Sequence, residues 1–314
     1  MRSSDPGALV DGALAGDRGS IARLITLVET GGDAAVEAVG RLYTRTGKAY
    51  TVGITGAPGA GKSTLTDRLV ACWRRTGDEV GVLAIDPTSP FSGGAILGDR
   101  VRMQDHATDP GVFIRSMATR GHLGGLSLAT PQAVRVLDAA GKPWIVVETV
   151  GVGQVEVEIA DAADTTIVVV NPGWGDGVQA AKAGLLEIAD VFVVNKADRP
   201  GTDDAVRNLV QMLELSAARP WTPPIIEAVA TESRGIEELA AAVAAHRTHL
   251  EVTGELGARR AARLRDELRA IVTARLATRA DELCRGDVFD GLVAAVASRE
   301  LDPYGAVNRL LAPG

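Results

Sequence analysis

The chain has 314 residues, 46% of them hydrophobic, which is enough to bury the core of one large α/β domain with appendages or of two domains. Its net charge of −7 argues against a general nucleic-acid-binding protein, and its two distant cysteines argue against a disulfide framework or a cysteine zinc site. No apolar run approaches the roughly 18 residues of a membrane span and the N-terminus has no apolar signal core, so we expect a cytoplasmic protein with no membrane or nucleic-acid partner.

The first 48 residues have the spacing of short helices. Apolar residues recur at helical intervals over Ala8–Ala15, Ser20–Val28 and Asp33–Tyr43. Because no motif with recognisable chemistry occurs here, we interpret residues 1–48 as an N-terminal helical extension.

Short apolar runs alternate with helical segments over residues 49–252. The runs are nearly continuous in Val and Ile, which is typical of strands buried on both faces. They are Tyr50–Thr55, Val80–Ile85, Val112–Ser116, Trp144–Glu148, Thr165–Val170, Val191–Asn195 and Ile225–Val229. We therefore predict an α/β fold with a doubly wound, mostly parallel sheet, which binds its ligands at the carboxyl ends of the strands.

A phosphate-binding pattern, G-x-x-x-x-G-K-S, lies between the first predicted strand and the helix that follows it. Glycines let backbone N–H groups surround phosphate oxygens, and the helix N-terminus adds a positive dipole end. Lys62 can reach the outer phosphates, and the Ser63 hydroxyl can ligate Mg²⁺. The residues of this predicted P-loop are Gly56, Ala57, Pro58, Gly59, Ala60, Gly61, Lys62 and Ser63. The alternative is an ordinary glycine turn.

Carboxylates near the ends of two further predicted strands are candidates for the metal. Asp86 follows the second strand, and Asp99 opens a helical segment after a loop rich in proline and glycine. Both carboxylates could face the metal or the attacking water, or they could be a turn residue and a helix cap. Glu148 ends the fourth strand, where the Mg²⁺ shell of such proteins is completed. Gly151 then lets its N–H approach a γ-phosphate.

The residue after Gly151 is Val152, where a glutamine would orient the attacking water. We therefore expect slow intrinsic hydrolysis unless another element supplies that group.

An N-K-x-D pattern follows the sixth predicted strand. It consists of Asn195, Lys196 and Asp198. The carboxylate of Asp198 can accept two hydrogen bonds from guanine, which adenine cannot donate, so the pattern predicts GTP rather than ATP as the substrate. The stem of Lys196 would cover the base and Asn195 would brace the loop. The alternative is a solvated turn.

Residues 253–314 change in character and are rich in Ala, Leu and Arg. One long helical pattern covers Glu255–Arg285, with an apolar stripe from Leu264 to Leu276, and two shorter patterns follow. The helix either packs on its own domain or pairs with another subunit. We assign residues 253–314 as a C-terminal helical arm that forms a homodimer.

These motifs together resemble the MeaB/ArgK family of GTPases, which are associated with methylmalonyl-CoA mutase. The resemblance extends from about residue 15 to about residue 250 and is most specific in the long glycine-rich segments. Besides the P-loop it rests on Asp86–Pro90, Gly93–Arg100, Phe113–Gly125, Glu148–Gln154 and Asn195–Asp198. It implies a GTP-driven chaperone of an adenosylcobalamin-dependent acyl-CoA mutase, which gates cofactor loading and protects the mutase.

The resemblance also implies residue roles. It places Thr64 with Lys62 and Ser63 at the phosphates and Mg²⁺. It assigns catalysis to Lys62, Asp99 and Glu148, and the metal to Ser63, Asp86, Asp99 and Glu148. Gln179 and Lys182 resemble side chains that relay the nucleotide state to the mutase.

Two departures from the family pattern concern the base and the third mobile loop. The backbone at Ala230 would back the guanine in place of the serine often found there. Residues 171–182 match a third mobile loop of the family, and Trp174 puts a large aromatic side chain there. The roles of Trp174 and His122 stay open.

Two other functions are compatible with the phosphate-binding residues. A P-loop kinase could transfer the phosphate to a protein or small molecule, although no extra substrate lid is evident. A metal-insertion GTPase needs soft or imidazole ligands. His246 and His249 lie three residues apart, and we expect them to form a solvated helix end rather than a metal site.

Overall fold

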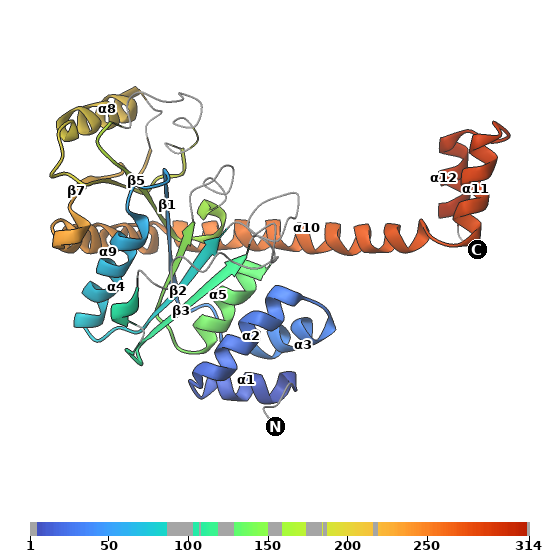
Figure 1. Cartoon of the computed structure of the whole chain (residues 1–314), viewed down its shortest axis with the longest axis horizontal. Coiled ribbons are helices and arrows are strands. Elements are labelled where there is room, and N and C mark those ends of the chain that lie inside the picture. Colours follow the sequence, from blue (N-terminus) through green and yellow to red (C-terminus); the bar gives the residue numbers. More distant parts are fainter. Residues whose placement is uncertain are drawn as a thin grey trace. The chain divides into compact units, whose positions relative to one another are not determined.

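Seven strands form a parallel sheet in the computed structural model, in the order β3-β2-β4-β1-β5-β6-β7 (Figure 1). The structure describes residues 5–86, 103–106, 108–118, 129–149, 159–173, 184, 187–215 and 219–312. The strands are β1 (Tyr50–Gly56), β2 (Val80–Asp86), β3 (Val112–Ala118), β4 (Trp144–Thr149), β5 (Thr165–Val170), β6 (Val191–Asn195) and β7 (Ile225–Ala228). The predicted α/β class with a parallel sheet is confirmed.

The chain divides into two compact units, Met1–Arg260 and Ala261–Gly314. The division that we expected from the sequence, at residues 48 and 252, stays a prediction. None of the described helices is both long and apolar enough to cross a membrane.

Helices cover both faces of the sheet, which explains why its strands are apolar along their whole length. One face packs against α4 (Lys62–Arg75) and α9 (Ile236–Thr253), and the other against α5 (Ala129–Ala139) and α8 (Thr202–Leu215). Successive residues of a strand point to opposite faces, so every position is buried. In β5 and β6 all residues are buried.

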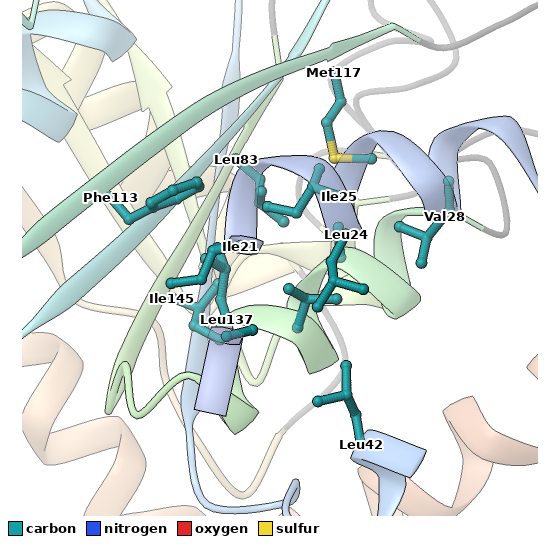
Figure 2. Close-up of a cluster of buried hydrophobic side chains, with 14 of the residues drawn as sticks. Ile21, Leu24, Ile25, Val28, Leu42, Leu83, Phe113, Met117, Leu137 and Ile145 are labelled. Atoms are coloured by element: carbon teal, nitrogen blue, oxygen red, sulfur yellow. The ribbon is translucent and has the colours of Figure 1, made fainter. Parts of the chain in front are cut away.

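Three N-terminal helices add a further layer over α5 and the edge strand β3. They are α1 (Pro6–Leu14), α2 (Arg18–Thr30) and α3 (Asp33–Tyr43). The apolar stripe of α2, spaced at 3–4 residues, meets side chains of α5 and β3 in one cluster (Figure 2). The side chains of α2 in this cluster are Ile21, Leu24, Ile25 and Val28. Each fully buried side chain of this size contributes ~1.5–3 kcal/mol.

Two buried aspartates fix the amino-terminal edge of the sheet. Asp164 accepts the N–H of Thr51 at 3.0 Å, and Asp190 accepts the N–H of Thr166 at 2.8 Å. The helix α10 (Glu255–Leu283) begins beside them. Its Arg260 donates to Asp164 at 2.6 Å, and its Arg259 donates to Asp190 at 3.1 Å. The start of α10 is therefore part of the first unit.

His246 lies in the middle of this polar network. Its side chain is fully buried, its Nδ1 lies 2.8 Å from the Thr165 hydroxyl, and the Trp221 ring is 4.9 Å away. Our prediction of a solvated helix end was wrong for His246, because α9 packs this face against β5 and β6. The side chain of His249 is only 19% exposed.

The second unit contains most of α10, α11 (Asp287–Ala297) and α12 (Pro303–Leu311). Asp302 caps α12 by accepting the N–H groups of Tyr304 and Gly305, each at 3.0 Å. Ala306 is the one buried residue among those that the structure describes here. Large apolar side chains remain exposed, among them Leu268, Leu276 and Val288.

We expect His246 to make stability depend on pH. Burial, and next the charge of Arg259, lower its pKa from 6.5 to about 4. Between these values the unfolded chain binds a proton that the folded chain does not, so the free energy of unfolding falls as the pH falls through this window. From pH 7 to about pH 4.5 the effect amounts to about 2 kcal/mol.

Urea unfolding of the wild type and of His246→Gln at these two pH values measures the effect. Asp190 has the opposite effect on the free energy of unfolding, because burial raises the pKa of its carboxyl group. The comparison of the two proteins therefore isolates the contribution of His246. Between these two pH values, the free energy of unfolding of the variant should fall by about 2 kcal/mol less than that of the wild type. Equal losses in both proteins would contradict the prediction.

Candidate nucleotide-binding site

The predicted P-loop lies at the carboxyl end of β1, pressed against its neighbours. Gly56 ends β1 with φ of 136°, and a Cβ there would lie 2.0 Å from the carbonyl oxygen of Val169 in β5. Gly61 has φ of 91°, and its Cβ would lie 2.4 Å from Nδ2 of Asn195. Only glycine allows both the positive φ and the close approach, so β5 and β6 fix the path of the loop.

Helix α4 begins directly after the loop, at Lys62. Gly61 supplies no side-chain cap, and the N-terminus of this 14-residue helix has the N–H groups and the dipole that bind anions. The ammonium of Lys62 donates to the carbonyl oxygens of Gly56 at 2.7 Å and Ala57 at 3.1 Å. These bonds hold the positive charge within the loop that would surround the phosphates.

A hydroxyl and a carboxylate meet beside the loop. Ser63 donates from Oγ to Oε1 of Glu148 at 2.6 Å, and Glu148 is 1% exposed. The sheet register causes this, because Glu148 of β4 lies opposite Ile54 of β1, two residues before the loop. A hydroxyl that donates its proton to a carboxylate keeps oxygen lone pairs for a hard cation. The pair therefore fits the shell of Mg²⁺.

The other predicted metal ligands are less fully described. Asp86 ends β2 as predicted, and its side chain lies outside the described part of the structure. Asp99 and Gly151 also lie outside the described residues. Within the described ranges no three His, Cys, Asp or Glu side chains gather as metal ligands. Residues Gln179 and Lys182, together with His122 and Trp174, fall in undescribed ranges too.

Asn195, at the end of β6, connects three parts of the site. Its Nδ2 donates to the carbonyl oxygen of Ala60 in the P-loop at 2.8 Å. Its Oδ1 accepts the N–H of Ala230 at 3.1 Å, at the start of the short helix η5 (Ala230–Glu232). Asn195 is 2% exposed, so these bonds are shielded from water. In this structure the backbone of Ala230 holds Asn195, the first residue of the N-K-x-D pattern, by this hydrogen bond.

The two other residues of the base pattern remain accessible. Lys196 adopts φ of 60° and donates from Nζ to the carbonyl oxygen of Gly59 at 2.6 Å, which places its stem along the P-loop. Asp198 is exposed two residues later. The arrangement leaves a carboxylate available to read a base beside the lysine stem. In the P-loop itself Pro58 is exposed and Ala60 is buried, and Thr64, which follows the loop in α4, is partly buried.

The structure reveals two bonded residues beside the site that sequence patterns did not predict. Thr55 and Thr149 lie one residue before Gly56 and one after Glu148, and their hydroxyl oxygens are 3.2 Å apart. No spacing rule indicates such a pair, because it depends on which strands are neighbours.

Comparisons with known proteins show the family of the chain. The family model described as methylmalonyl Co-A mutase-associated GTPase MeaB matches residues 21–284. A relative from Pyrococcus abyssi, named after GTPase activity, is 51% identical over 307 residues, which are 96% of this chain and 95% of the relative. The Escherichia coli protein named GTPase ArgK is 37% identical over 250 residues, 77% of this chain and 76% of that protein.

Two further matches extend the comparison. The mouse (Mus musculus) protein named methylmalonic aciduria type A homolog, mitochondrial, is 35% identical over 271 residues, 80% of this chain and 65% of that protein. A crystal structure described as LAO/AO transport system kinase has a TM-score of 0.71 and 25% identity, and the match covers 99% of this chain and 97% of that one. The resemblance seen in the motifs is confirmed.

We expect Asp198→Asn to lose the preference for guanine. The variant removes a carboxylate that would accept two hydrogen bonds, so GTP should bind roughly 100-fold more weakly while ATP binding stays unchanged. Titration of fluorescent GTP and ATP analogues measures both affinities. Asp203→Asn, an exposed aspartate in the first turn of α8, is the matched control. An unchanged GTP to ATP ratio would contradict the base-reading role.

Proposed function

Because the chain belongs to the methylmalonyl-CoA mutase-associated GTPase family MeaB and hydrolyses GTP, we propose that it is a Mg²⁺-dependent chaperone of an adenosylcobalamin-dependent acyl-CoA mutase. It gates the loading of the mutase cofactor and protects the mutase from inactivation. The family description, which names the mutase, and the relative named after methylmalonic aciduria support this function. We also propose a cytoplasmic location, in line with the unpaired cysteines Cys72 and Cys284.

The observation that carries the proposal is the contact of Ser63 with Glu148 beside the bonded ammonium of Lys62. Lys62 would bind the outer phosphates, and Ser63 and Glu148 would hold the metal together with Asp86 and Asp99. Mg²⁺ would supply positive charge that neutralises the phosphates. The N–H of Gly151 would be the donor to the γ-phosphate.

The mutase completes the site for hydrolysis. Val152 has no group that can orient the attacking water, so hydrolysis by the chain alone is slow. Gln179 and Lys182 relay the nucleotide state to the mutase. Binding of the mutase then organises the missing catalytic group and accelerates turnover.

A phosphotransferase is the second candidate, favoured by the name of the solved structure with a TM-score of 0.71. The same phosphate-binding residues would pass the phosphate to a protein or small molecule instead of water. A metal-insertion GTPase has less support, because His246 is buried and bonded to Thr165 and no metal cluster occurs within the described ranges.

We expect GTP hydrolysis to rise several-fold when the mutase is added. Release of phosphate by the purified chain is measured with and without an adenosylcobalamin-dependent acyl-CoA mutase, with ATP as the control nucleotide. Lys62→Ala is the matched inactive variant, because it removes the cation that holds the phosphates. GTP turnover that is indifferent to the mutase would overturn the chaperone function, and phosphate found on an acceptor would favour the phosphotransferase.

The second unit supports a homodimer. A fold with one buried residue among those described and exposed Leu268, Leu276 and Val288 gains little from its own core. A second copy of the chain covers these side chains in our proposal.

We expect a chain that ends at Arg260 to be a monomer with unchanged basal GTPase activity. This truncation keeps the ion pairs of Arg259 and Arg260 with the sheet, which removal of all residues from 255 onwards would break. Light scattering measures the mass of the full chain and of the truncated chain. A truncated chain that remains dimeric would place the interface in the first unit.

A further inference from the structure

The end of β1 and the end of β4 are joined by a bond between two threonine side chains. Thr149 donates from Oγ1 to Oγ1 of Thr55 at 3.2 Å. Both residues are buried, with relative exposures of 1% and 0%. The β1–β4 register ends with the pair of Ile54 and Glu148, and the two threonines follow this pair, one residue further along each strand.

This bond completes a ring of contacts that includes the residues predicted to bind the phosphates and the metal. Gly56, next to Thr55, accepts from the ammonium of Lys62 at 2.7 Å. Ser63, next to Lys62, donates to Glu148 at 2.6 Å, and Thr149 follows Glu148. Three hydrogen bonds and three chain steps therefore connect the P-loop, the start of α4 and the end of β4 into one closed ring.

The two threonines lie on the face of the sheet opposite to α4. Neighbouring residues of a strand point to opposite faces of the sheet. Ile54 packs in the cluster with α4, and the Glu148 side chain meets Ser63 of α4. Thr55 and Thr149 therefore face the other side of the sheet and do not reach the nucleotide. A buried hydroxyl is unfavourable unless it is bonded, so the pair is held together in the protein interior.

We propose that Thr55 and Thr149 are positioning residues for GTP hydrolysis. Their bond sets the distance between the P-loop and Glu148, and through it the geometry in which Ser63 and Glu148 hold Mg²⁺. The proposal rests on the GTPase activity and on the proposed role of Glu148 at the metal. Neither threonine touches the substrate, so the expected defect lies in the metal dependence and in kcat.

The test replaces each threonine by valine, which keeps the shape and removes the hydroxyl. Thr149→Val should lower kcat for GTP about five- to tenfold and raise the Mg²⁺ concentration for half-maximal activity by a similar factor. Binding of GDP without Mg²⁺ should change less than about twofold, because the P-loop contacts remain. Thr149→Ser keeps the hydroxyl and should restore the metal dependence.

Two further variants separate positioning from stability. The double variant Thr55→Val with Thr149→Val should need the same Mg²⁺ concentration for half-maximal activity as either single variant. Each single substitution already removes the one bond that the two threonines share. Thr165→Val is the matched control, because Thr165 is equally buried and bonds the Tyr50 hydroxyl at 2.7 Å at the amino-terminal edge of the sheet. It should lower the melting temperature and leave the Mg²⁺ dependence unchanged.

The outcomes distinguish this proposal from the function on which it rests. If the wild type does not hydrolyse GTP, the function itself fails. If the wild type is active and Thr149→Val has the Mg²⁺ dependence of the wild type, the positioning role is overturned. If Thr149→Val does not fold, Thr55→Val decides the question, because it removes the acceptor of the same bond. Equal shifts in Mg²⁺ dependence for Thr165→Val and Thr149→Val would mean a general loss of stability and would also overturn the proposal.

Discussion

The close approach of Gly56 to β5 is the constraint on which the nucleotide site depends. A side chain at this position would lie 2.0 Å from the Val169 carbonyl oxygen, so the chain can leave β1 along this path only with glycine. This path directs the P-loop over the ends of β5 and β6, where Asn195 bonds Ala60. It also places the start of α4, with Lys62 and Ser63, beside the end of β4. The residues predicted to bind the phosphates, the metal and the base therefore lie close together, because glycine at this turn allows the chain to follow this path.

The two edges of the sheet have different tasks. At the carboxyl edge, the start of α4 and the ends of β4 and β6 bring Lys62, Ser63, Glu148 and Asn195 to the P-loop. At the amino-terminal edge, buried aspartates accept strand N–H groups and pair with the arginines that begin α10. Removing either arginine would leave a buried carboxylate without its charged partner, which is costly. The amino-terminal edge therefore anchors the strands, and the candidate nucleotide site lies at the opposite edge.

The function has a similar division between what the chain contains and what a partner supplies. In our proposal, the P-loop, the Ser63–Glu148 pair and the accessible Asp198 form the guanine nucleotide site within one chain. Val152 offers no group for the attacking water, and the second unit leaves apolar side chains exposed. Both features agree with a GTPase whose activity and assembly depend on other molecules.

The sequence by itself determined the α/β class, the seven strands, the P-loop pattern and the N-K-x-D pattern that carry the family resemblance. These features follow from local patterns: continuous Val and Ile runs, a glycine-rich turn of fixed spacing and a four-residue motif after a strand. Such patterns can be recognised in the sequence because each one lies within a single stretch of chain.

Only the tertiary structure decided which distant residues become neighbours. The burial of His246 depends on how α9 packs against the sheet, and the helical spacing alone did not reveal it. The bonds from Asn195 to Ala230 and from Thr149 to Thr55 depend on strand order and register. Periodicity tells which face of an element is buried, but it does not tell which element covers that face, because that choice is made by packing across the whole sheet.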